Sequence, residues 1–274
     1  NNTGVGSGAL ISATTANHNT AVGRAALSQT SVGASNTAVG KDALKDNTTG
    51  AGNTAVGDSA AGNCTTADGN TAVGSNSLFT NTTGDGITAI GRAALYFNST
   101  GSENTAVGRA ALKANTTASN NTAVGRDALT ANTTGATNVA IGKSSLANNT
   151  TAANNTAMGA NALLTNTTGS ALVAIGSSAL YSNTTADNNV AVGNTALYNN
   201  TTGTKNIAVG PSCLLTNTTG SFNVAIGLSA LYANTTAPNN TGIGTEALKS
   251  NTTGTQNVAV GAFSMINNTT ANNN

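Results

Sequence analysis

The sequence repeats with a period of 17 residues, and no insertion or deletion breaks the register. The unit reads N-T-A-V-G-x-x-A-L-x-x-N-T-T-G/A-x-x, and we number its positions one to seventeen from the first Asn. The glycine at position five marks the register in all sixteen units, from Gly6 to Gly261. We therefore interpret residues 1–274 as a single tandem-repeat array without terminal caps.

A unit this short cannot bury a hydrophobic face alone, so neighbouring units must stack on one another. Positions two and four carry Thr, Val or Ile almost throughout, and β-branched residues two apart are typical of one face of a strand. Gly at five predicts a turn, and the Ala-Leu pair predicts a second strand near positions eight to ten. The Asn-Thr-Thr segment predicts a third short strand or a long turn. The fold class is therefore all-β, a parallel β-solenoid (β-roll or β-helix) of about 16 coils of 17 residues.

Other repeat folds do not fit this pattern. Helical solenoid units usually exceed about 30 residues, and Thr, Asn and Gly are poor helix formers. Collagen needs Gly at every third position, which is absent. With 7% charged residues, 3% aromatic residues and no Trp, the chain also lacks the bulky side chains that fill a thick globular core. The core must be thin and drawn out along the stacking direction.

The alternation of side chains along a strand predicts which positions face inward. We expect positions two, four and nine to point into the coil, with Asn side chains of position one stacked in a column. The core residues predicted in this way are Val22, Leu27, Val39, Leu44, Val107, Leu112, Ile141, Leu146, Ile175, Leu180, Ile226 and Leu231.

Positions three and eight are restricted to small residues. If they point outward, this restriction indicates close packing against a partner, which we expect to be another copy of the chain. The alternative is that one of the two lies at a cramped inner corner. The self-association residues predicted at position three are Ala21, Ala38, Ala106, Ala123, Ala140, Ala191, Ala208 and Ala225.

The Asn-Thr-Thr segment allows three interpretations. It can form an Asn and Thr ladder that closes the turn, it can present Thr rows to ice, or it can carry N-linked glycans at its formal Asn-x-Thr acceptors. The acceptor asparagines are Asn47, Asn81, Asn98, Asn115, Asn132, Asn149, Asn166, Asn183, Asn200, Asn217, Asn234, Asn251 and Asn268.

No residue pattern predicts catalysis, a metal site or a cofactor. The single histidine, His18, has no adjacent nucleophile or orienting acid, and the nine acidic residues are scattered over the units. Cys64 and Cys213 lie nine units apart, about 43 Å at a coil spacing of about 4.8 Å, so they cannot form a disulfide within one stack. We predict that the chain is not an enzyme.

Two surface columns remain as candidate contact sites. Position six carries a basic stripe, which is either a solvated face or a polyanion site: Arg24, Lys41, Arg92, Arg109, Arg126 and Lys143. Position ten carries aromatic residues, which can stack on sugars or line a chain–chain contact: Phe79, Tyr96, Tyr181, Tyr198 and Tyr232. The net charge of +1 gives no reason to expect nucleic-acid binding, and no apolar run approaches the roughly 20 residues of a membrane span.

The N-T-A-V-G and N-V-A-I-G elements, as in Asn138-Val139-Ala140-Ile141-Gly142, resemble the head repeats of YadA-type trimeric autotransporter adhesins. The longer unit also resembles repeats of phage tail fibres and bacterial surface fibres. The resemblance implies a left-handed parallel β-roll, often trimeric, exposed outside the cell or on a virion.

We therefore expect a structural segment of an extracellular fibre or adhesin, located outside the cell, on the cell surface or on a virion. The expected partners are further copies of the chain, in a trimer or an end-to-end filament, and host or surface glycans. The alternatives are an ice-binding solenoid and a glycosylated stalk. The missing caps favour an excerpt of a longer chain or subunits whose ends stack.

Overall fold

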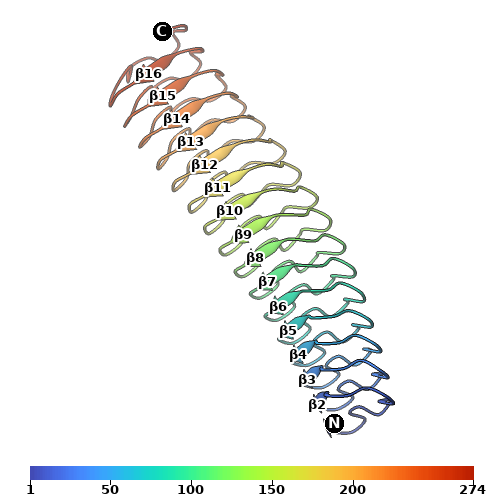
Figure 1. Ribbon diagram of the computed structural model, residues 1–274. Coiled ribbons are helices and arrows are strands. Elements are labelled where there is room, and N and C mark those ends of the chain that lie inside the picture. Colours follow the sequence, from blue (N-terminus) through green and yellow to red (C-terminus); the bar gives the residue numbers. More distant parts are fainter. The chain divides into compact units, whose positions relative to one another are not determined.

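The computed structural model describes residues 1–274 and confirms the all-β parallel solenoid. The chain divides into two compact units, Asn1–Thr137 and Asn138–Asn274, and the boundary falls between two coils of the repeat. Each unit contains eight strands of three residues, one at positions two to four of every coil (Figure 1). The first unit holds β1 (Thr3–Val5), β2 (Thr20–Val22), β3 (Thr37–Val39), β4 (Thr54–Val56), β5 (Thr71–Val73), β6 (Thr88–Ile90), β7 (Thr105–Val107) and β8 (Thr122–Val124). The second holds β9 (Val139–Ile141), β10 (Thr156–Met158), β11 (Val173–Ile175), β12 (Val190–Val192), β13 (Ile207–Val209), β14 (Val224–Ile226), β15 (Thr241–Ile243) and β16 (Val258–Val260).

Within each unit, every strand pairs in parallel with the strand of the next coil at a register of 17 residues. Ala21 lies opposite Ala38 between β2 and β3, and Ala191 lies opposite Ala208 between β12 and β13. Equivalent positions therefore stack directly on one another along each unit, as the repeat predicts.

Hydrogen bonding between coils continues well beyond the strands. The backbone N–H of position nine donates to the next coil, from Leu44 to the Ala60 carbonyl at 3.0 Å, and that of position thirteen does the same. The N–H of position five donates to the preceding coil, from Gly40 to the Val22 carbonyl at 2.8 Å. Only a few residues of each coil form a strand, yet bonds to the coils above and below run around its whole circumference. These bonds satisfy backbone groups that the thin core would otherwise leave unpaired.

The second strand predicted near positions eight to ten is wrong, because this part of the coil is a turn. Positions seven and nine have left-handed backbone angles, with φ of 54° at Ala25 and 49° at Leu27. The Leu side chains still point inward, but the chain reaches them through a tight, strained turn rather than an extended strand. The Asn-Thr-Thr segment also forms no strand, in agreement with the long-turn alternative.

The predicted orientation of the first strand is also wrong, because position three points inward and positions two and four point outward. Val22 is 38% exposed whereas its neighbour Ala21 is fully buried. The β-branched residues predicted in the core therefore lie on the outer surface: Val22, Val39, Val107, Ile141, Ile175 and Ile226. The leucines predicted at position nine are confirmed as fully buried: Leu27, Leu44, Leu112, Leu146, Leu180 and Leu231.

The alanines predicted as self-association residues are all inside the coil, with 0% exposure, so they offer no surface to a partner: Ala21, Ala38, Ala106, Ala123, Ala140, Ala191, Ala208 and Ala225. The restriction to small residues has an internal cause. A methyl group added to Gly242, at position three, would lie 3.3 Å from Cγ of Leu231 and 3.1 Å from the Ala247 carbonyl oxygen. The coil is so thin that only a methyl group fits between the strand and the leucine column, as the inner-corner alternative stated.

The asparagines of position one form a buried column, as predicted, but they bond mainly to backbone groups. Oδ1 of Asn19 accepts the Asn36 N–H of the next coil at 2.8 Å. Nδ2 of Asn36 donates to the Gly50 carbonyl of its own coil, also at 2.8 Å. Each Asn thus links two coils and closes its own coil. Ile87 and Leu172 interrupt the column, yet their N–H groups still donate to the asparagine before them.

The glycine of position five is required by close contact between coils. At Gly108, φ is +134°, and an added Cβ would lie 2.5 Å from the carbonyl oxygen of Gly125 in the next coil. No side chain tolerates that contact or favours that backbone angle. This double constraint explains why position five is Gly in all sixteen units.

Position fifteen shows a second, weaker form of the same crowding. It is Gly or Ala, and a methyl added to Gly220 would lie 2.7 Å from the Ala237 carbonyl oxygen of the next coil. The chain never places Ala there in two successive coils. Each Ala coil also carries Asn, Gly or His at position seventeen, where φ is near +60°, whereas Gly coils accept Lys205 or Phe222 there. Coils that bear the crowded methyl thus carry mostly Asn or Gly, the residues best suited to the left-handed angle.

We predict that Gly108→Ala lowers the free energy of unfolding by at least about 2–3 kcal/mol, because the coils must separate locally and the backbone must change. Gly69→Ala is the matched control. Gly69 also has a positive φ, of +66°, but an added Cβ there would meet nothing within 4 Å. It should cost about 1 kcal/mol. Denaturant unfolding followed by circular dichroism measures both, and equal losses would contradict the close-contact explanation.

Candidate interaction surfaces

The outward side chains of positions two and four form a regular surface on each unit, which we call the strand face. In the first unit, position two is Thr in all eight strands and position four is Val or Ile. The position-four side chains are large and either exposed, for example 37% at Val56 and 38% at Ile90, or half-buried, as at Val73. No charged residue stands at either position. The strand face is thus a flat, uncharged strip of methyl and hydroxyl groups.

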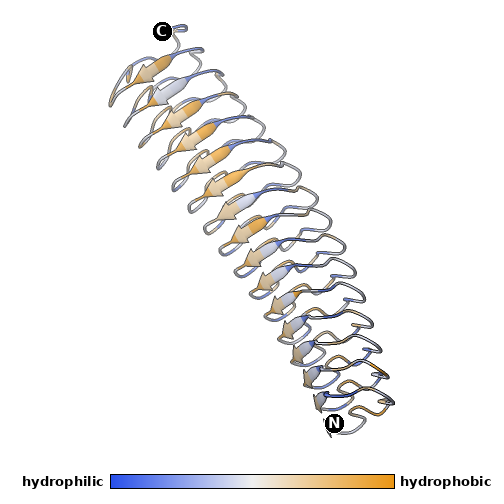
Figure 2. Ribbon diagram, viewed as in Figure 1, coloured by the Kyte–Doolittle hydropathy of each residue, from blue (hydrophilic) through white to orange (hydrophobic).

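The strand face of the second unit is more apolar. Six of its eight strands begin with Val or Ile instead of Thr, as in Ile207–Val209, where Ile207 is 41% exposed. Figure 2 shows this difference as orange strands at β9, β11–β14 and β16, against pale strands in most of the first unit. A β-branched pair on the outside of a strand is the opposite of the expected pattern.

The asparagines of position twelve form a side-chain ladder inside the Asn-Thr-Thr turn. Nδ2 of Asn98 donates to Oδ1 of Asn81 in the preceding coil at 2.9 Å and to the Gly101 carbonyl of its own coil at 2.8 Å. Of the three interpretations of this segment, the ladder is confirmed. It is a second polar column within the thin core.

The same ladder contradicts the predicted glycosylation sites. A glycan would have to be attached to an Nδ2 atom that is fully buried and already donates to its neighbours, so the folded chain offers no acceptor at twelve of the thirteen positions: Asn47, Asn81, Asn98, Asn115, Asn132, Asn149, Asn166, Asn183, Asn200, Asn217, Asn234 and Asn251. Asn268, in the last coil, is only partly exposed, and its Nδ2 donates to Oδ1 of Asn251 at 3.1 Å.

Some Thr residues of this turn also form hydrogen bonds between coils. Oγ1 of Thr48, at position thirteen, donates to the Thr65 carbonyl of the next coil at 3.1 Å. The Thr at position fourteen is exposed, as at Thr49. One exposed Thr per coil gives a single row rather than the two-dimensional array that the ice-binding interpretation of this turn requires.

Cys64 replaces Asn in the position-twelve ladder and leaves a defect. The Oδ1 atom of Asn47, in the preceding coil, is the one buried side-chain polar atom without a hydrogen-bond partner. An Asn at position 64 would donate to this atom, but the thiol does not. On the other side, Nδ2 of Asn81 approaches the Cys64 sulfur at 4.0 Å.

Both cysteines are free and buried. Burial raises the pKa of the Cys64 thiol to about 11 and that of Cys213 to about 12, because the thiolate would lose its hydration. Cys213 stands at position eight, and its sulfur lies 2.9 Å from the Gly210 carbonyl oxygen. Ser77 bonds the equivalent carbonyl at 2.9 Å. Cys213 is thus a small internal donor.

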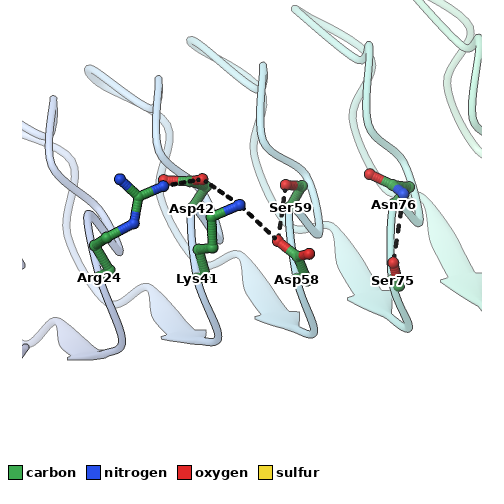
Figure 3. A network of polar contacts seen from close by, with 7 residues as sticks. All are labelled: Arg24, Lys41, Asp42, Asp58, Ser59, Ser75 and Asn76. Carbon is green, nitrogen blue, oxygen red and sulfur yellow. Dashed lines mark hydrogen bonds and ion pairs between the residues drawn. The ribbon is translucent and has the colours of Figure 1, made fainter.

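The basic stripe of position six is neutralised in its first part. Nη2 of Arg24 lies 3.1 Å from Oδ2 of Asp42, and Nζ of Lys41 lies 3.3 Å from the same oxygen. Lys41 also approaches Oδ1 of Asp58 at 3.7 Å, so charges of alternating sign follow one another along three coils (Figure 3). Ser59 adds a hydrogen bond to Asp58. Two cations meet two carboxylates here, which indicates a solvated, balanced face.

Further along the first unit, the stripe lines a hollow of about 250 Å³, which we call the basic hollow. Its walls come from coils six to eight and comprise Arg92, Ala93, Arg109, Ala110, Lys113, Asp127 and Thr130. Lys113 was not recognised as part of a site from the sequence, because it belongs to position ten and joins the stripe only through the turn between positions six and ten.

The aromatic residues of position ten stack on one another between coils. The rings of Phe79 and Tyr96 are 5.3 Å apart at their centroids, and those of Tyr181 and Tyr198 are 4.9 Å apart and nearly parallel. Phe97 packs edge-on against Tyr96 at 4.6 Å. Tyr232 is 36% exposed and contributes no ring contact. In the position-ten column, some rings thus stack between coils, whereas Tyr232 remains exposed on the surface.

The acidic residues of position sixteen form hydrogen bonds between coils. Oδ1 of Asp68 accepts the Ala51 N–H of the preceding coil, and Asp85 and Asp187 accept equivalent bonds, all at 2.6–2.7 Å.

The structure contains no group of three metal-ligating His, Cys, Asp or Glu side chains. His18 lies on an exposed turn with a left-handed φ of 57°. No helix of membrane-spanning length and hydropathy occurs in the structure.

No family model, curated protein sequence or solved structure matches this chain.

We predict that Cys64→Asn raises the free energy of unfolding by about 1–3 kcal/mol, because the new amide completes the ladder and gives Asn47 Oδ1 a donor. Cys213→Ser is the control, since Ser already occupies the equivalent position in other coils and keeps the bond to the carbonyl. It should change stability by less than about 0.5 kcal/mol. Denaturant unfolding measures both variants. A Cys64→Asn variant no more stable than the parent would show that the ladder does not control stability there.

Proposed function

We propose that this chain is a structural segment of an extracellular fibre or adhesin that self-associates through its strand face and carries out no catalysis. The observation that supports this is the row of exposed or half-exposed side chains at position four, Val or Ile in every coil except for Met158, on a surface without charge. The likeness of the repeat to YadA-type heads and tail-fibre shafts supports the extracellular location and the fibre role.

The size of the strand face agrees with a contact surface. Strands of three residues in eight coils cover roughly 10 Å by 38 Å, or about 400 Å² on each unit. That is the size of the largest apolar patch on a typical monomer, which is often functional. Further copies of the chain are the partner that this repeat matches best, since the same spacing of side chains recurs on them.

If the strand face holds copies together, the double variant Val39→Lys with Val56→Lys should shift the chain to a monomer. Both side chains stand on the face, and burying two lysines between copies costs several kcal/mol. The measurement is sedimentation velocity or light scattering over a range of concentrations.

The control is Ile11→Lys with Val32→Lys, which adds the same charge at exposed apolar positions away from the strand face. These side chains are 75% and 50% exposed. The control should keep the oligomer of the parent chain. A parent chain that is monomeric at all concentrations would overturn the proposal.

Ice binding is a second candidate, because the first unit aligns eight outward Thr residues beside eight outward Val or Ile residues on its strand face. A flat, uncharged, regular array of hydroxyl and methyl groups can order water into an ice-like layer. This array differs from the Thr rows expected in the Asn-Thr-Thr turn, which the fold uses for hydrogen bonds between coils.

The ice-binding candidate predicts thermal hysteresis in the parent chain and its loss in Thr71→Lys, which places a charge in the middle of the face. Thr49→Lys, at the exposed position fourteen, should retain the activity. Nanolitre osmometry at millimolar protein concentration is the measurement. The absence of hysteresis in the parent chain would remove this candidate and leave self-association as the function of the face.

A further inference from the structure

The basic hollow differs from the rest of the position-six stripe in its charge balance. Arg109 and Arg126 both use the same carboxylate, that of Asp127, at 3.7 Å and 3.1 Å. Arg92 and Lys113 form no ion pair. Of the four cations of coils six to eight, two therefore share the Asp127 carboxylate and two have no ion pair, whereas Arg24 and Lys41 pair with two carboxylates, Asp42 and Asp58, in coils two to four.

The cations are free to meet a ligand. Arg109 and Arg126 expose 55% and 50% of their side chains, and Arg92 and Lys113 are exposed as well. The hollow of about 250 Å³ is lined by Arg92, Arg109 and Lys113 together with the small residues of position seven, Ala93 and Ala110. The residues that line the hollow carry three cations and one carboxylate, and a concave surface with this excess of two positive charges concentrates anions.

The spacing of the cations selects the kind of anion. Arg92, Arg109 and Arg126 occupy the same position in successive coils, so their attachment points are about 4.8 Å apart along the unit. That distance is close to the length of one sugar residue in an extended polysaccharide. The phosphates of an extended single-stranded nucleic acid are spaced more widely. Arginine also binds planar or tetrahedral oxyanions through paired N–H groups.

An aromatic cluster adjoins the hollow on the same surface. The N–H of Phe97 donates to the carbonyl of Lys113 in the next coil at 3.0 Å, so these two residues are neighbours across coils. Phe79, Tyr96 and Phe97 pack against one another there, and Phe97 remains 47% exposed. An exposed ring beside cations offers an apolar contact for the C–H face of a sugar while the cations hold its acidic groups.

We propose that the basic hollow, with Phe97 beside it, is a binding site for an acidic polysaccharide, in particular a sulfated one. Arg92, Arg109 and Lys113 bind its anionic groups, and Phe97 contacts a sugar ring. This site lies outside the strand face and does not depend on self-association.

The test is the affinity of the full chain for a size-defined heparin oligosaccharide, measured by isothermal titration calorimetry at low and high salt. The triple variant Arg92→Gln, Arg109→Gln, Lys113→Gln should lose about tenfold or more in affinity, because it removes all three cations that line the hollow. Phe97→Ala should also weaken binding, whereas Phe222→Ala, at an exposed ring in the second unit, should leave it unchanged.

The chain provides a matched control in coils two and three. Arg24→Gln, Lys41→Gln and Lys45→Gln remove three cations from the same repeat positions, six, six and ten, and change the net charge equally. All six side chains are exposed, so both variants should fold as the parent does. The control should lose less than about twofold in affinity.

Three results would overturn the proposal. The first is an equal loss of affinity in both triple variants, which would indicate a general charge effect. The second is an absence of heparin binding by the parent chain. The third is tighter binding of a single-stranded oligonucleotide of equal charge than of heparin, which would assign the hollow to nucleic acid.

Discussion

Hydrogen bonding between successive coils, in strict register, is the constraint on which the other features of this structure depend. Within each unit, backbone bonds join every coil to the next, and the Asn columns of positions one and twelve add side-chain bonds inside. These bonds hold the coils close enough that Gly108 and its equivalents cannot carry a side chain. An unpaired group anywhere in such a stack is costly, and Asn47 Oδ1 shows how one replacement in a column leaves its neighbour unpaired.

The same constraint separates the residues that maintain the fold from those that are free to vary. Inside, one leucine, two alanines and two asparagines per coil fill a space with room for little else. On the outside, the residues of the strand face lie in regular rows because the strands pair in register. Burial does not account for the Val and Ile in these rows, so their presence on the surface needs another explanation. The basic hollow is different again. It depends on Arg92, Arg109 and Lys113, which are not required by the stacking and occur together only in a few coils.

Much of the fold was predictable from the period and from residue types. The parallel solenoid, the strand at positions two to four, the Gly turn, the buried Leu column and the Asn columns all follow from the repeat. The orientation of the strand did not, because β-branched residues in a strand usually indicate the buried face, and here Ala21 rather than Val22 is inside. The turn at positions eight to ten was missed because Leu rarely adopts the left-handed angle that Leu27 has. The basic hollow was missed because Lys113 and Arg109 belong to different columns, and only the turn that joins them brings the two side chains to one surface.

The uniform contact between coils has a consequence for how such a chain can change over generations. Each coil presents the same hydrogen-bonding edge above and below, so a gene segment encoding 17 residues can be duplicated or lost by recombination without a new interface. Interior columns would continue across the junction, and the strand face would lengthen or shorten by one row. Individual sites such as the basic hollow would be copied whole only when several neighbouring coils are duplicated together. Length is therefore the property of this protein that mutation can alter most easily, whereas the proposed binding site is copied intact only if coils six to eight are duplicated together.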